Sequence, residues 1–436
     1  MCAVRHPRDG EPSVRSDRPA VCLDGPATEG GAHGTHILVI NSGSSSIKFK
    51  LYEAESETLV MSGTVGRIGE SGSYIECKTE SGKLLEERVL PTHAAGLEAI
   101  MDALVAEPLG MLGSLAEVSA LGHRAVHGGD LFTGSVVVND DVIAKLRECS
   151  PLAPLHNPAN LMGIVEAQRL LPDVPQVAVF DTAFHQTMPR HAYLYAIPYE
   201  YYERYRVRRY GFHGSSYRFV SARAVELMGK ATEDVRMVVC HLGNGASMAA
   251  IVGGRSVDTS MGLTPLEGLI MGTRSGDLDP GIVFFLRRHL EMDVDEIDDL
   301  LNTQSGFAGV SGAGKDLRDV QTKAAAGDER CELALDMYCY RVRKYIGAYA
   351  AAMGGIDALV FTGGIGENSS LVRARVCANL GFLGIRLDDR LNSDSRSGAR
   401  LLDDETTSVR VMVIPTDEEI VIVRDTLALM KEAAAG

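Results

Sequence analysis

Short apolar runs alternate with glycine- and serine-rich turns along much of the chain, and the first clear example lies near its start. Residues 37–40 are all apolar, residues 41–46 contain only Asn, Gly and Ser, and apolar residues then alternate with polar ones through 47–51. This order predicts a strand, a turn and a second strand. Small residues in the turn allow successive backbone N–H groups to point into one concavity, which is the arrangement that binds a phosphate, and Lys48 lies just beyond it.

The same arrangement returns about two hundred residues later. Residues 236–252 read as an apolar strand, a turn of Gly, Asn and Ser at 243–247, and a second apolar strand. Two such units predict two related halves that face each other across a cleft and clamp a polyphosphate. A third glycine segment follows the apolar residues 358–362, and we expect a loop there with a helix beginning near Ser369, beside the same anion.

Apolar residues at helical spacing predict helices between these strands. One helix is expected to end before Pro108, a second to carry Pro158 in its first turn, and a third to place Cys331 and Cys339 on its apolar face. We therefore assign these two cysteines to the core rather than to chemistry. The apolar run at 411–414 is expected to be the last strand and to lead into a C-terminal helix.

Length and charge narrow the class of protein. A chain of 436 residues is too long for one hydrophobic core and predicts two domains. Its formal net charge of −15 argues against nucleic acid or an anionic membrane as a partner. No apolar run is long enough to span a bilayer, and the eight cysteines include no CxxC pair, so a reduced, cytoplasmic protein is expected. Residues 1–35 lack apolar periodicity and are expected to be a disordered leader.

Three charged residues are candidates for chemistry on an anion. Arg124 lies in LGHRAVHGGD, where its guanidinium could fork to a carboxylate or phosphate, although a surface arginine at a strand end is an alternative. Arg274 lies in a turn of glycines and aspartates and is the second candidate arginine. Asp181 follows the apolar strand 177–180, a position typical of catalytic carboxylates in α/β proteins, but it could equally cap a helix.

Other positions are open to more than one interpretation. His213 lies between glycines in YGFHGSS, where a structural histidine is the commoner case. The carboxylates at 417–419 could reach a magnesium ion or cap the final helix. Residues 309–316, GVSGAGKD, match the P-loop spacing until Asp316 replaces the required Ser or Thr, and no convincing strand precedes them. We therefore reject a P-loop NTPase and expect Lys315 to be solvated or peripheral to a nucleotide.

From about His36 to the C-terminus the chain resembles the acetate kinase family. The resemblance is carried by motifs in the family's order: INSGSSSIKF, GHRAVHGG, DTAFHQTMP, YGFHGSS, HLGNGAS, TPLEGLIMGTRSG, TGGIGEN and PTDEE. It implies the duplicated, actin-like and ribonuclease H-like α/β fold that sugar kinases, actin and the seventy-kilodalton chaperones share, with a five-stranded sheet in each of two domains and a central cleft. Residues 36–182 and 418–436 would form the N-terminal domain, and residues 183–417 the C-terminal domain.

The resemblance also implies roles for individual residues. The catalytic group would be Asp181 as the essential carboxylate, Arg124 at acetate or acetyl phosphate, and His213 and Arg274 at the transferring phosphoryl group. The other implied contacts are Val126, Leu155, Phe212 and Pro265 around the methyl group; Ser44, Ser46 and Lys48 near the phosphates; Asn41 and Glu418 at the metal; and His241, Leu242, Gly243, Asn244, Gly245, Asp316, Leu317, Arg318, Gly364, Ile365, Gly366, Glu367 and Asn368 at ATP.

The implied reaction is the reversible, in-line transfer of the ATP γ-phosphoryl group to acetate, giving acetyl phosphate and ADP, with Mg²⁺ or alternatively Mn²⁺ as the metal. Acetate is already ionised near neutral pH, so Asp181 is expected to orient an arginine or Mg²⁺ rather than to act as a base. A propionate or butyrate kinase is one alternative, against which a small pocket at Val126 argues. A nucleotide switch without catalysis is another, against which the two arginines and His213 argue. The resemblance further implies a homodimer joined through the C-terminal domain.

Overall fold

The computed structural model describes residues 35–154, 156–404 and 406–435. Residues 1–34, which belong to the expected disordered leader, lie outside these ranges. Leu155, expected near the methyl group, lies outside them as well. None of the helices in the described ranges is long and apolar enough to cross a membrane. Six cysteines in those ranges are unpaired and buried.

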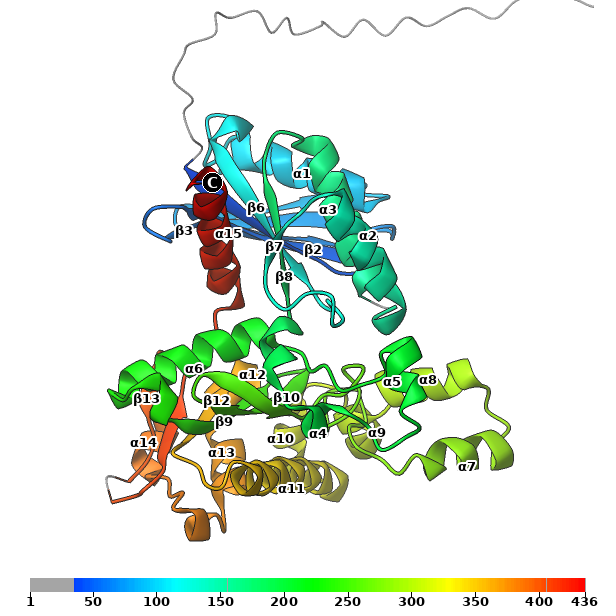
Figure 1. The fold of residues 1–436 in the computed structure, drawn as a ribbon, viewed down its shortest axis with the longest axis vertical. Coiled ribbons are helices and arrows are strands. Elements are labelled where there is room, and N and C mark those ends of the chain that lie inside the picture. The colour runs from blue at the N-terminus through cyan, green and yellow to red at the C-terminus, as the bar shows by residue number, and fades with distance from the viewer. Residues whose placement is uncertain (1–34, 155, 405, 436) are drawn as a thin grey trace, which may run out of the picture. The chain divides into compact units, whose positions relative to one another are not determined.

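The first half of the chain is built on an eight-stranded sheet with the order β5-β4-β3-β2-β1-β6-β8-β7 (Figure 1). Strands β1 to β5 pair antiparallel in succession, and β6 and β8 extend the sheet parallel to β1. The bounds of the strands are β1 His36–Ser42, β2 Ser46–Glu53, β3 Leu59–Gly66, β4 Tyr74–Thr79, β5 Gly82–Glu87, β6 Val118–Ala125, β7 Val136–Val137 and β8 Gln176–Phe180.

The second half is built on a six-stranded sheet with the order β11-β10-β9-β12-β14-β13. Its first three strands pair antiparallel, and β12 and β14 are parallel to β9. The bounds are β9 Arg236–Leu242, β10 Ala246–Val252, β11 Arg255–Thr259, β12 Ala358–Thr362, β13 Arg400–Leu401 and β14 Arg410–Val413.

Both sheets therefore contain the same five-stranded unit. In each unit, the third strand pairs with the second and the second with the first, all antiparallel. The first strand then pairs in parallel with the fourth, and the fourth in parallel with the fifth, which gives the orders β3-β2-β1-β6-β8 and β11-β10-β9-β12-β14. This order confirms the expected duplicated, actin-like α/β fold. The sheets are larger than the five strands expected, because β4, β5 and β7 extend the first and β13 extends the second.

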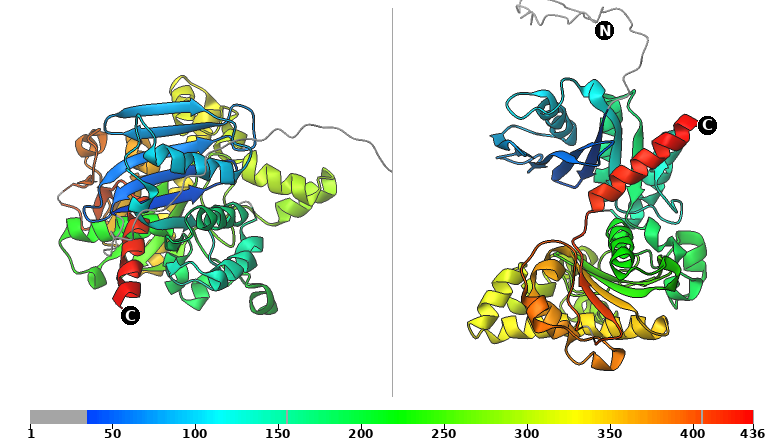
Figure 2. Two further views of the ribbon diagram at one scale, coloured as in Figure 1. Left: turned by 90° about the horizontal axis from the view of Figure 1, so that it is seen from above. Right: turned by 90° about the vertical axis from the view of Figure 1, so that its left-hand side faces the viewer.

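Alternating side chains of each first strand enter two different cores, as the period of a strand requires. Leu38 and Ile40 of β1 pack under α1 (His93–Val105), whereas Ile37 and Val39 pack against α15 (Glu418–Ala435). The second sheet repeats this division, with α11 (Glu329–Ala352) on one face and α6 (Gly214–Met228) on the other. Figure 2 shows the C-terminal helix α15 lying against the first sheet.

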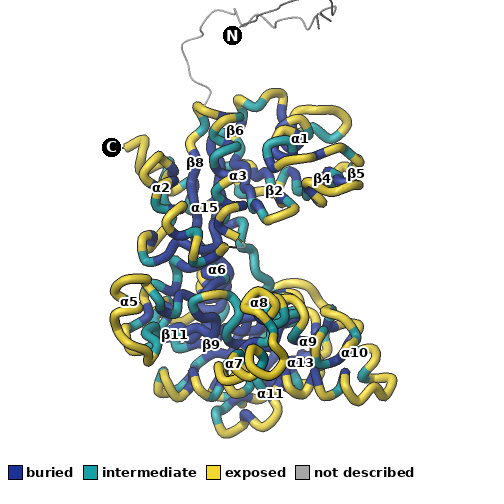
Figure 3. The backbone as a smooth tube through the Cα atoms, turned by 90° about the vertical axis from the view of Figure 1, so that its right-hand side faces the viewer, coloured by how far each residue is buried: buried dark blue, intermediate teal, exposed yellow. Residues whose placement is uncertain are grey.

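Helices α6 and α15 connect the two halves. They lie side by side (Figure 3), and Phe219 of α6 packs against the cores of both sheets. Arg218 of α6 donates two hydrogen bonds to Asp425 of α15, at 2.7 and 2.9 Å. The remaining helices are α2 Asp140–Cys149, α3 Asn157–Leu170, α4 Arg190–Tyr193, α5 Glu200–Tyr205, α7 Gly281–His289, α8 Val294–Thr303, α9 Gly306–Ser311, α10 Leu317–Ala325, α12 Gly363–Asn368, α13 Ser370–Cys377 and α14 Asp389–Ser393.

Most of the elements expected from sequence are present, with one correction. The glycine segment after β12 is not a loop, because helix α12 begins directly at Gly363 and α13 follows from Ser370. A left-handed backbone at Gly363, with φ of 76°, turns the chain from the strand into that helix. The rejection of a P-loop at residues 309–316 is confirmed, because the segment begins inside helix α9 and follows α8, and no strand leads into it.

We expect Gly122→Ala to destabilise the protein, because β6 and α15 meet at Gly122. An added methyl group would lie 2.8 Å from Thr426 Oγ1 and even closer to Ile422. Overpacking of this kind costs about 1–3 kcal/mol. The matched control is Gly347→Ala in α11, where nothing lies within 4 Å of the added group and the better helix former should stabilise by about 0.5–1 kcal/mol. Denaturant unfolding measures both variants, and equal shifts would contradict this packing.

Candidate active site

The central pair of the site is Arg124 and Asp181, which stand at neighbouring strand ends. Strands β6 and β8 are parallel with Ala125 opposite Phe180, so the residues on either side of that position come together at one edge of the sheet. Arg124 Nε donates to Asp181 Oδ1 at 2.9 Å, and Nη2 donates to Oδ2 at 2.6 Å. Asp181 is 1% exposed. Arg124 is therefore not a free surface arginine, and the Asp181 side chain pairs with Arg124 instead of capping a helix.

Glu418, the first residue of α15, approaches the same arginine. Its Oε2 lies 3.8 Å from Arg124 Nε. Burial raises the pKa of Glu418 to about 7; Arg124 opposes that shift, and Asp181 and Glu419 reinforce it. For Arg124, burial alone would lower the pKa, but the charges of Asp181 and Glu418 outweigh it and raise the pKa. Capping of α15 is left to Asp417, which accepts from Ile420 N–H at 3.1 Å.

His213 lies at the start of α6 in a left-handed conformation, with φ of 59°. Its placement depends on Asp181, whose backbone carbonyl accepts from Gly214 N–H at 2.9 Å. His213 Nδ1 lies 2.8 Å from Ser247 Oγ, and the Tyr217 hydroxyl lies 2.5 Å from the same oxygen. With Tyr217 donating to Ser247 and Ser247 donating to Nδ1, the proton of a neutral imidazole would be on Nε2.

The electrostatics around His213 favour its neutral form. Burial lowers its pKa well below the usual value, and the positive charges of Arg124 and Arg274 act in the same direction. The ring stacks on His241, with centroids 4.2 Å apart. His241 in turn lies 2.8 Å from Ser216 Oγ, which accepts from Thr416 Oγ1 at 2.8 Å. The histidines are therefore held by a hydrogen-bonded series that reaches the residues just before α15.

Arg274 lies in the long segment after β11, half-buried beside the glycine turn of the second sheet. Its Nη1 donates to the carbonyl of Pro265 at 2.7 Å, and an added methyl group at Gly245 would lie 3.0 Å from Nη2 and 3.7 Å from His213 Nε2. Burial lowers the pKa of Arg274. Arg274, Gly245 and His213 therefore converge on one place.

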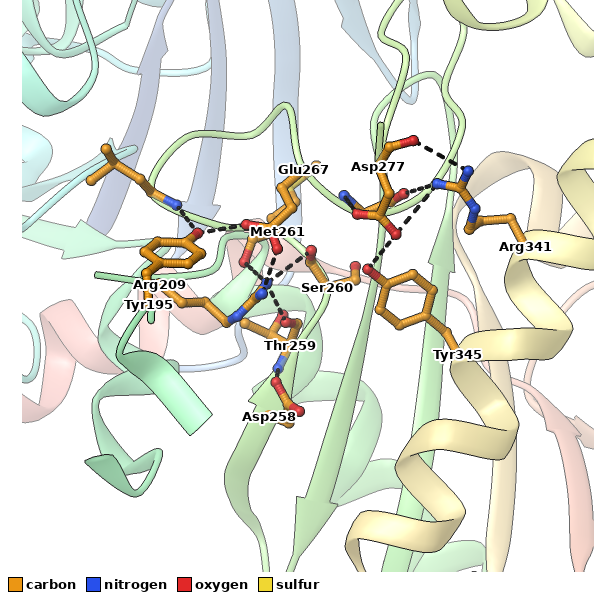
Figure 4. Close-up of polar contacts among 12 residues, drawn as sticks. Tyr195, Arg209, Asp258, Thr259, Ser260, Met261, Glu267, Asp277, Arg341 and Tyr345 are labelled. Atoms are coloured by element: carbon orange, nitrogen blue, oxygen red, sulfur yellow. Dashed lines mark hydrogen bonds and ion pairs between the residues drawn. The ribbon is translucent and has the colours of Figure 1, made fainter. Parts of the chain in front are cut away.

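Hydrogen bonds and ion pairs hold both ends of the segment from Glu267 to Asp277, within which Arg274 lies in the sequence (Figure 4). On one side Arg209 pairs with Glu267, and Tyr195 donates to the same carboxylate. The other end is held at Asp277, which accepts from Gly268 N–H at 2.8 Å and from the Tyr345 hydroxyl at 2.9 Å. Arg209 also donates to the carbonyls of Thr259, Ser260 and Met261, and Arg341 donates to that of Gly268.

The first glycine- and serine-rich turn lies between β1 and β2, as expected from the sequence. Asn41 and Lys48 are opposite each other in the antiparallel pair, and both line a depression of the sheet that also includes Glu419. Ser44 is exposed and Ser46 half-buried. Lys48 is close enough to Glu418 for its charge to lower the pKa of that carboxyl, against the effect of burial.

The residues expected at the nucleotide gather around the second turn. Gly272 N–H donates to the Asn244 carbonyl at 3.1 Å, and an added methyl group at Gly272 would lie 3.1 Å from the Lys315 carbonyl. Gln321 of α10 donates to Ser369 at 2.6 Å, which joins α10 to the segment of α12 and α13.

Several side chains among the residues expected at the nucleotide already contact other parts of the protein. Leu242 and Leu317 lie in the core of the second half, so only their backbone could meet a ligand. Asp316 caps α10 and pairs with Arg318 at 2.6 Å. Glu367 accepts from Gly363 N–H at 2.9 Å and from Thr416 N–H at 3.4 Å, which ties α12 to the chain before α15.

The remaining candidates surround Arg124 and Arg274. Val126 and Phe212 belong to one apolar cluster, although they come from different segments, and Pro265 is half-buried nearby through its contact with Arg274. Sequence reasoning missed His156. His156 is an exposed residue, and desolvation together with the charges of Arg274 and Arg124 lowers its pKa, so it stands close to both arginines. No motif marks this residue, because its position depends on how α3 packs.

Comparison with known proteins identifies the family. The model of the acetokinase family matches residues 36–424. The chain belongs to the acetokinase family. It is 54% identical to the acetate kinase of Thermotoga maritima over 398 residues, which are 91% of this chain and 99% of that protein.

Solved structures of the acetokinase family agree. The crystal structure of Porphyromonas gingivalis acetate kinase matches with a TM-score of 0.88 and 47% identity, over 91% of this chain and all of that one. A propionate kinase from Francisella tularensis matches with a TM-score of 0.85 and 41% identity, over 91% of this chain and 100% of its own. All the candidate residues of the site lie inside the span that the family model matches.

The raised pKa of Glu418 predicts a pH-dependent difference between wild type and Glu418→Gln. Between pH 4.5 and about 7 the folded protein keeps a proton that the unfolded chain has released, so the free energy of unfolding falls as pH rises. Glu418→Gln has no carboxyl group at this position, so its free energy of unfolding does not fall for this reason as pH rises. Its stability relative to wild type should therefore grow across that window, by about 1.4 kcal/mol per pKa unit of difference. Denaturant unfolding at several pH values tests this, with Glu432→Gln at the exposed end of α15 as control. A difference independent of pH would contradict it.

Proposed function

We propose that this protein is an acetate kinase that transfers the γ-phosphoryl group of ATP to acetate, reversibly and by direct in-line displacement. The observation that carries the proposal is the family match over residues 36–424, within which Arg124, Arg274 and His213 converge. Both substrates are anions, and bringing them together requires positive charge and hydrogen-bond donors at the reacting oxygens. The convergence of these three residues in a chain of net charge −15 supports that task.

Arg124 is proposed to receive the carboxylate of acetate. Asp181 uses both of its oxygens on Nε and Nη2 of Arg124, which fixes the plane of the guanidinium and leaves Nη1 for a ligand. Val126 and Phe212 would surround the methyl group, with Pro265 and with Leu155 as a further proposed contact. The acetate oxygen needs no base, since it is ionised at neutral pH. Asp181 is therefore an orienting residue in this mechanism.

His213 and Arg274 are proposed to stabilise the transferring phosphoryl group. Arg274 would offset charge on the equatorial oxygens of this group. His213, held neutral by burial and by two nearby arginines, would donate a hydrogen bond from Nε2 to one of the same oxygens. A neutral donor avoids adding a third buried positive charge beside Arg124 and Arg274, so its low pKa is consistent with this role.

The residues at the first turn fit Mg²⁺, which prefers oxygen ligands and usually takes one or two carboxylates together with substrate phosphates and water. Glu418 would supply a carboxylate and Asn41 an amide oxygen, and the same set would accept Mn²⁺. The described residues contain no cluster of three or more acidic, histidine or cysteine side chains that could hold a metal alone, which agrees with a metal shared with ATP. When bound, Mg²⁺ would neutralise phosphate charge.

The nucleotide is proposed to lie along the second turn. The backbone from His241 to Gly245 would face the phosphates from one side. Ser44, Ser46 and Lys48, at the first turn, would face them from the opposite side. Adenosine would lie between the start of α10, at Asp316 to Arg318, and helix α12, from Gly364 to Asn368. The contact between α10 and Ser369 supports this, because it brings those two segments close together.

The similarity to a propionate kinase makes propionate the second candidate substrate. One methylene group changes discrimination in an apolar pocket by only about 1–3 kcal/mol, so the family match alone does not separate the two acids. Val126 and Phe212, the proposed pocket walls, are 7% and 2% exposed. Acetate is kept as the first candidate because the relative at 54% identity and the solved structure at 47% identity are acetate kinases.

We also propose a homodimer and a cytoplasmic location. Helix α7 buries none of its residues, and Ile282, Phe284 and Phe285 are about half exposed, with Leu290 and Val294 exposed just beyond it. An apolar surface of this kind is typical of a protein interface, and a second copy of the chain is the proposed partner. The unpaired cysteines in the described ranges are consistent with a reducing compartment.

Trapping of acyl phosphate with hydroxylamine tests the proposed function. Purified protein with MgATP and acetate should form acetyl phosphate, seen as acetohydroxamate, and should form less product with propionate and least with butyrate at equal subsaturating concentrations. No product with any of the acids would exclude the kinase, and a higher kcat/KM for propionate would replace acetate with propionate as the substrate. Arg274→Ala should lower kcat by about 10²–10³-fold, as expected for loss of a group that acts on the transition state.

Asp181→Asn tests the orienting role of the carboxylate. The amide cannot fork to Arg124 as a carboxylate does, so we expect a rise in the KM for acetate and a fall in kcat of about 10²-fold from misplacement. The low-pH side of the rate profile should stay as in wild type. If the substitution instead removed one low-pH ionisation and left the affinities for acetate and MgATP intact, Asp181 would be a general base and the orienting role would be wrong.

A further inference from the structure

Two asparagines on one face of α3 contact the backbone of the site at the ends of β1 and β6. Asn157 and Asn160 are 1% and 3% exposed, and they are three residues apart, so they lie on the same side of the helix. Both side chains use amide oxygen and nitrogen together. A side-chain amide carries the same donor and acceptor as a peptide group, and it can therefore replace a strand partner where a ladder stops.

Asn160 joins the two sides of the proposed active site. Its Oδ1 accepts from Val126 N–H at 3.0 Å, and its Nδ2 donates to the carbonyl of Ser42 at 2.7 Å. Ser42 is the last residue of β1 and follows Asn41 at the start of the phosphate turn. Val126 is two residues beyond Arg124 and belongs to the proposed methyl pocket. The pairing of β1 with β6 stops at Ile40 and His123, and beyond that point a single buried amide bridges the phosphate side and the acyl side.

Asn157 serves only one of these sides. It accepts from His127 N–H at 3.1 Å and donates to the His127 carbonyl at 2.8 Å. Helix α3 approaches β1 closely next to Asn160. An added methyl group at Gly163, one turn further along the helix, would lie 2.8 Å from Ser42 Cβ. The helix therefore meets the phosphate turn where Asn160 does.

The carbonyls of the phosphate turn are held from outside. Asn160 binds that of Ser42, His93 Nε2 lies 2.7 Å from that of Gly43, and Ile68 N–H donates to that of Ser45 at 3.0 Å. A free carbonyl facing a phosphate would repel it. By binding the carbonyl oxygens, these donors from three separate segments favour a turn whose N–H groups can face the anion.

We propose that Asn160 is a positioning residue for phosphoryl transfer, which couples the phosphate turn at Ser42 to the acyl pocket at Val126. The proposal rests on the proposed kinase function. In-line transfer needs the acceptor oxygen and the phosphorus at near-attack distance, and a displacement of about 1 Å can cost about 10²-fold in rate. Asn160 touches neither substrate in this scheme, so it affects the rate through the relative placement of the two sides.

The test compares Asn160→Leu and Asn160→Asp with wild type in steady-state kinetics, with thermal unfolding measured in parallel. We expect kcat to fall by about 10²-fold in Asn160→Leu, while the KM values for MgATP and acetate change less than about threefold, because each half-site stays intact and only their separation changes. The matched control is Asn392→Leu. Asn392 is also 3% exposed and also donates to a backbone carbonyl, that of Ser370 at 3.0 Å, but it lies in α14. Its loss should lower stability without a comparable fall in kcat.

Asn160→Asp provides an independent readout if the leucine variant fails to fold. An ionised carboxyl keeps the acceptor for Val126 N–H but repels the Ser42 carbonyl, whereas a protonated carboxyl can donate to it. The kcat of this variant relative to wild type should therefore rise as pH falls. Wild-type kcat in either folded variant, or a relative kcat of Asn160→Asp that does not depend on pH, would overturn the positioning role. If wild type itself formed no acyl phosphate, the proposed function would fail and this inference with it.

Discussion

The ion pair between Arg124 and Asp181 is the interaction on which the site depends. It forms because two parallel strands, β6 and β8, end in register at the same edge of the first sheet. A carboxylate that is 1% exposed would be costly to bury alone, and the bidentate guanidinium compensates for that cost. The backbone of Asp181 also accepts from Gly214 N–H and so positions the start of α6. One residue thereby fixes the orientation of both an arginine and His213.

Charge balance explains the protonation states around this pair. Burial lowers the pKa of His213, and the positive charges of Arg124 and Arg274 add to that effect, so the imidazole remains neutral. Burial raises the pKa of Glu418, and the negative charge of Asp181 raises it further. Of these two carboxylates, Glu418 is the one that lies farther from Arg124. A site that gathers two anionic substrates needs this surplus of donors. The whole chain, at −15, would otherwise repel them.

The sequence predicted the duplicated fold because its signals are local. A strand, a small-residue turn and an alternating strand occur at 37–51 and again at 236–252, and both form in the structure as β1-β2 and β9-β10. Because glycine is a poor helix former, the glycines after β12 predict a loop, yet a helix forms there. In that helix Glu367 accepts from Gly363 N–H and also makes a tertiary contact with Thr416 N–H. Propensity is a weak signal in so short a segment.

Candidate residues in motifs could be found from the sequence, but their partners could not. The fork between Arg124 and Asp181 joins residues 57 positions apart, and the link from Asn160 to Ser42 spans 118. His156 approaches Arg124 and Arg274 only through the packing of α3. Such contacts depend on strand register and helix placement, which a pattern of apolar positions does not encode for single side chains. The sequence therefore indicated the chemistry of the site, and the structure added how its groups are oriented.

The most direct test of this account is a double-mutant cycle between Arg124 and Asp181, read as kcat/KM for acetate. If the two side chains act as one unit, Arg124→Met and Asp181→Asn should each cause a large loss, and the double variant should be little worse than the poorer single variant. Losses that add in the double variant would show that the two residues act independently, and they would contradict the claim that Asp181 works by orienting Arg124.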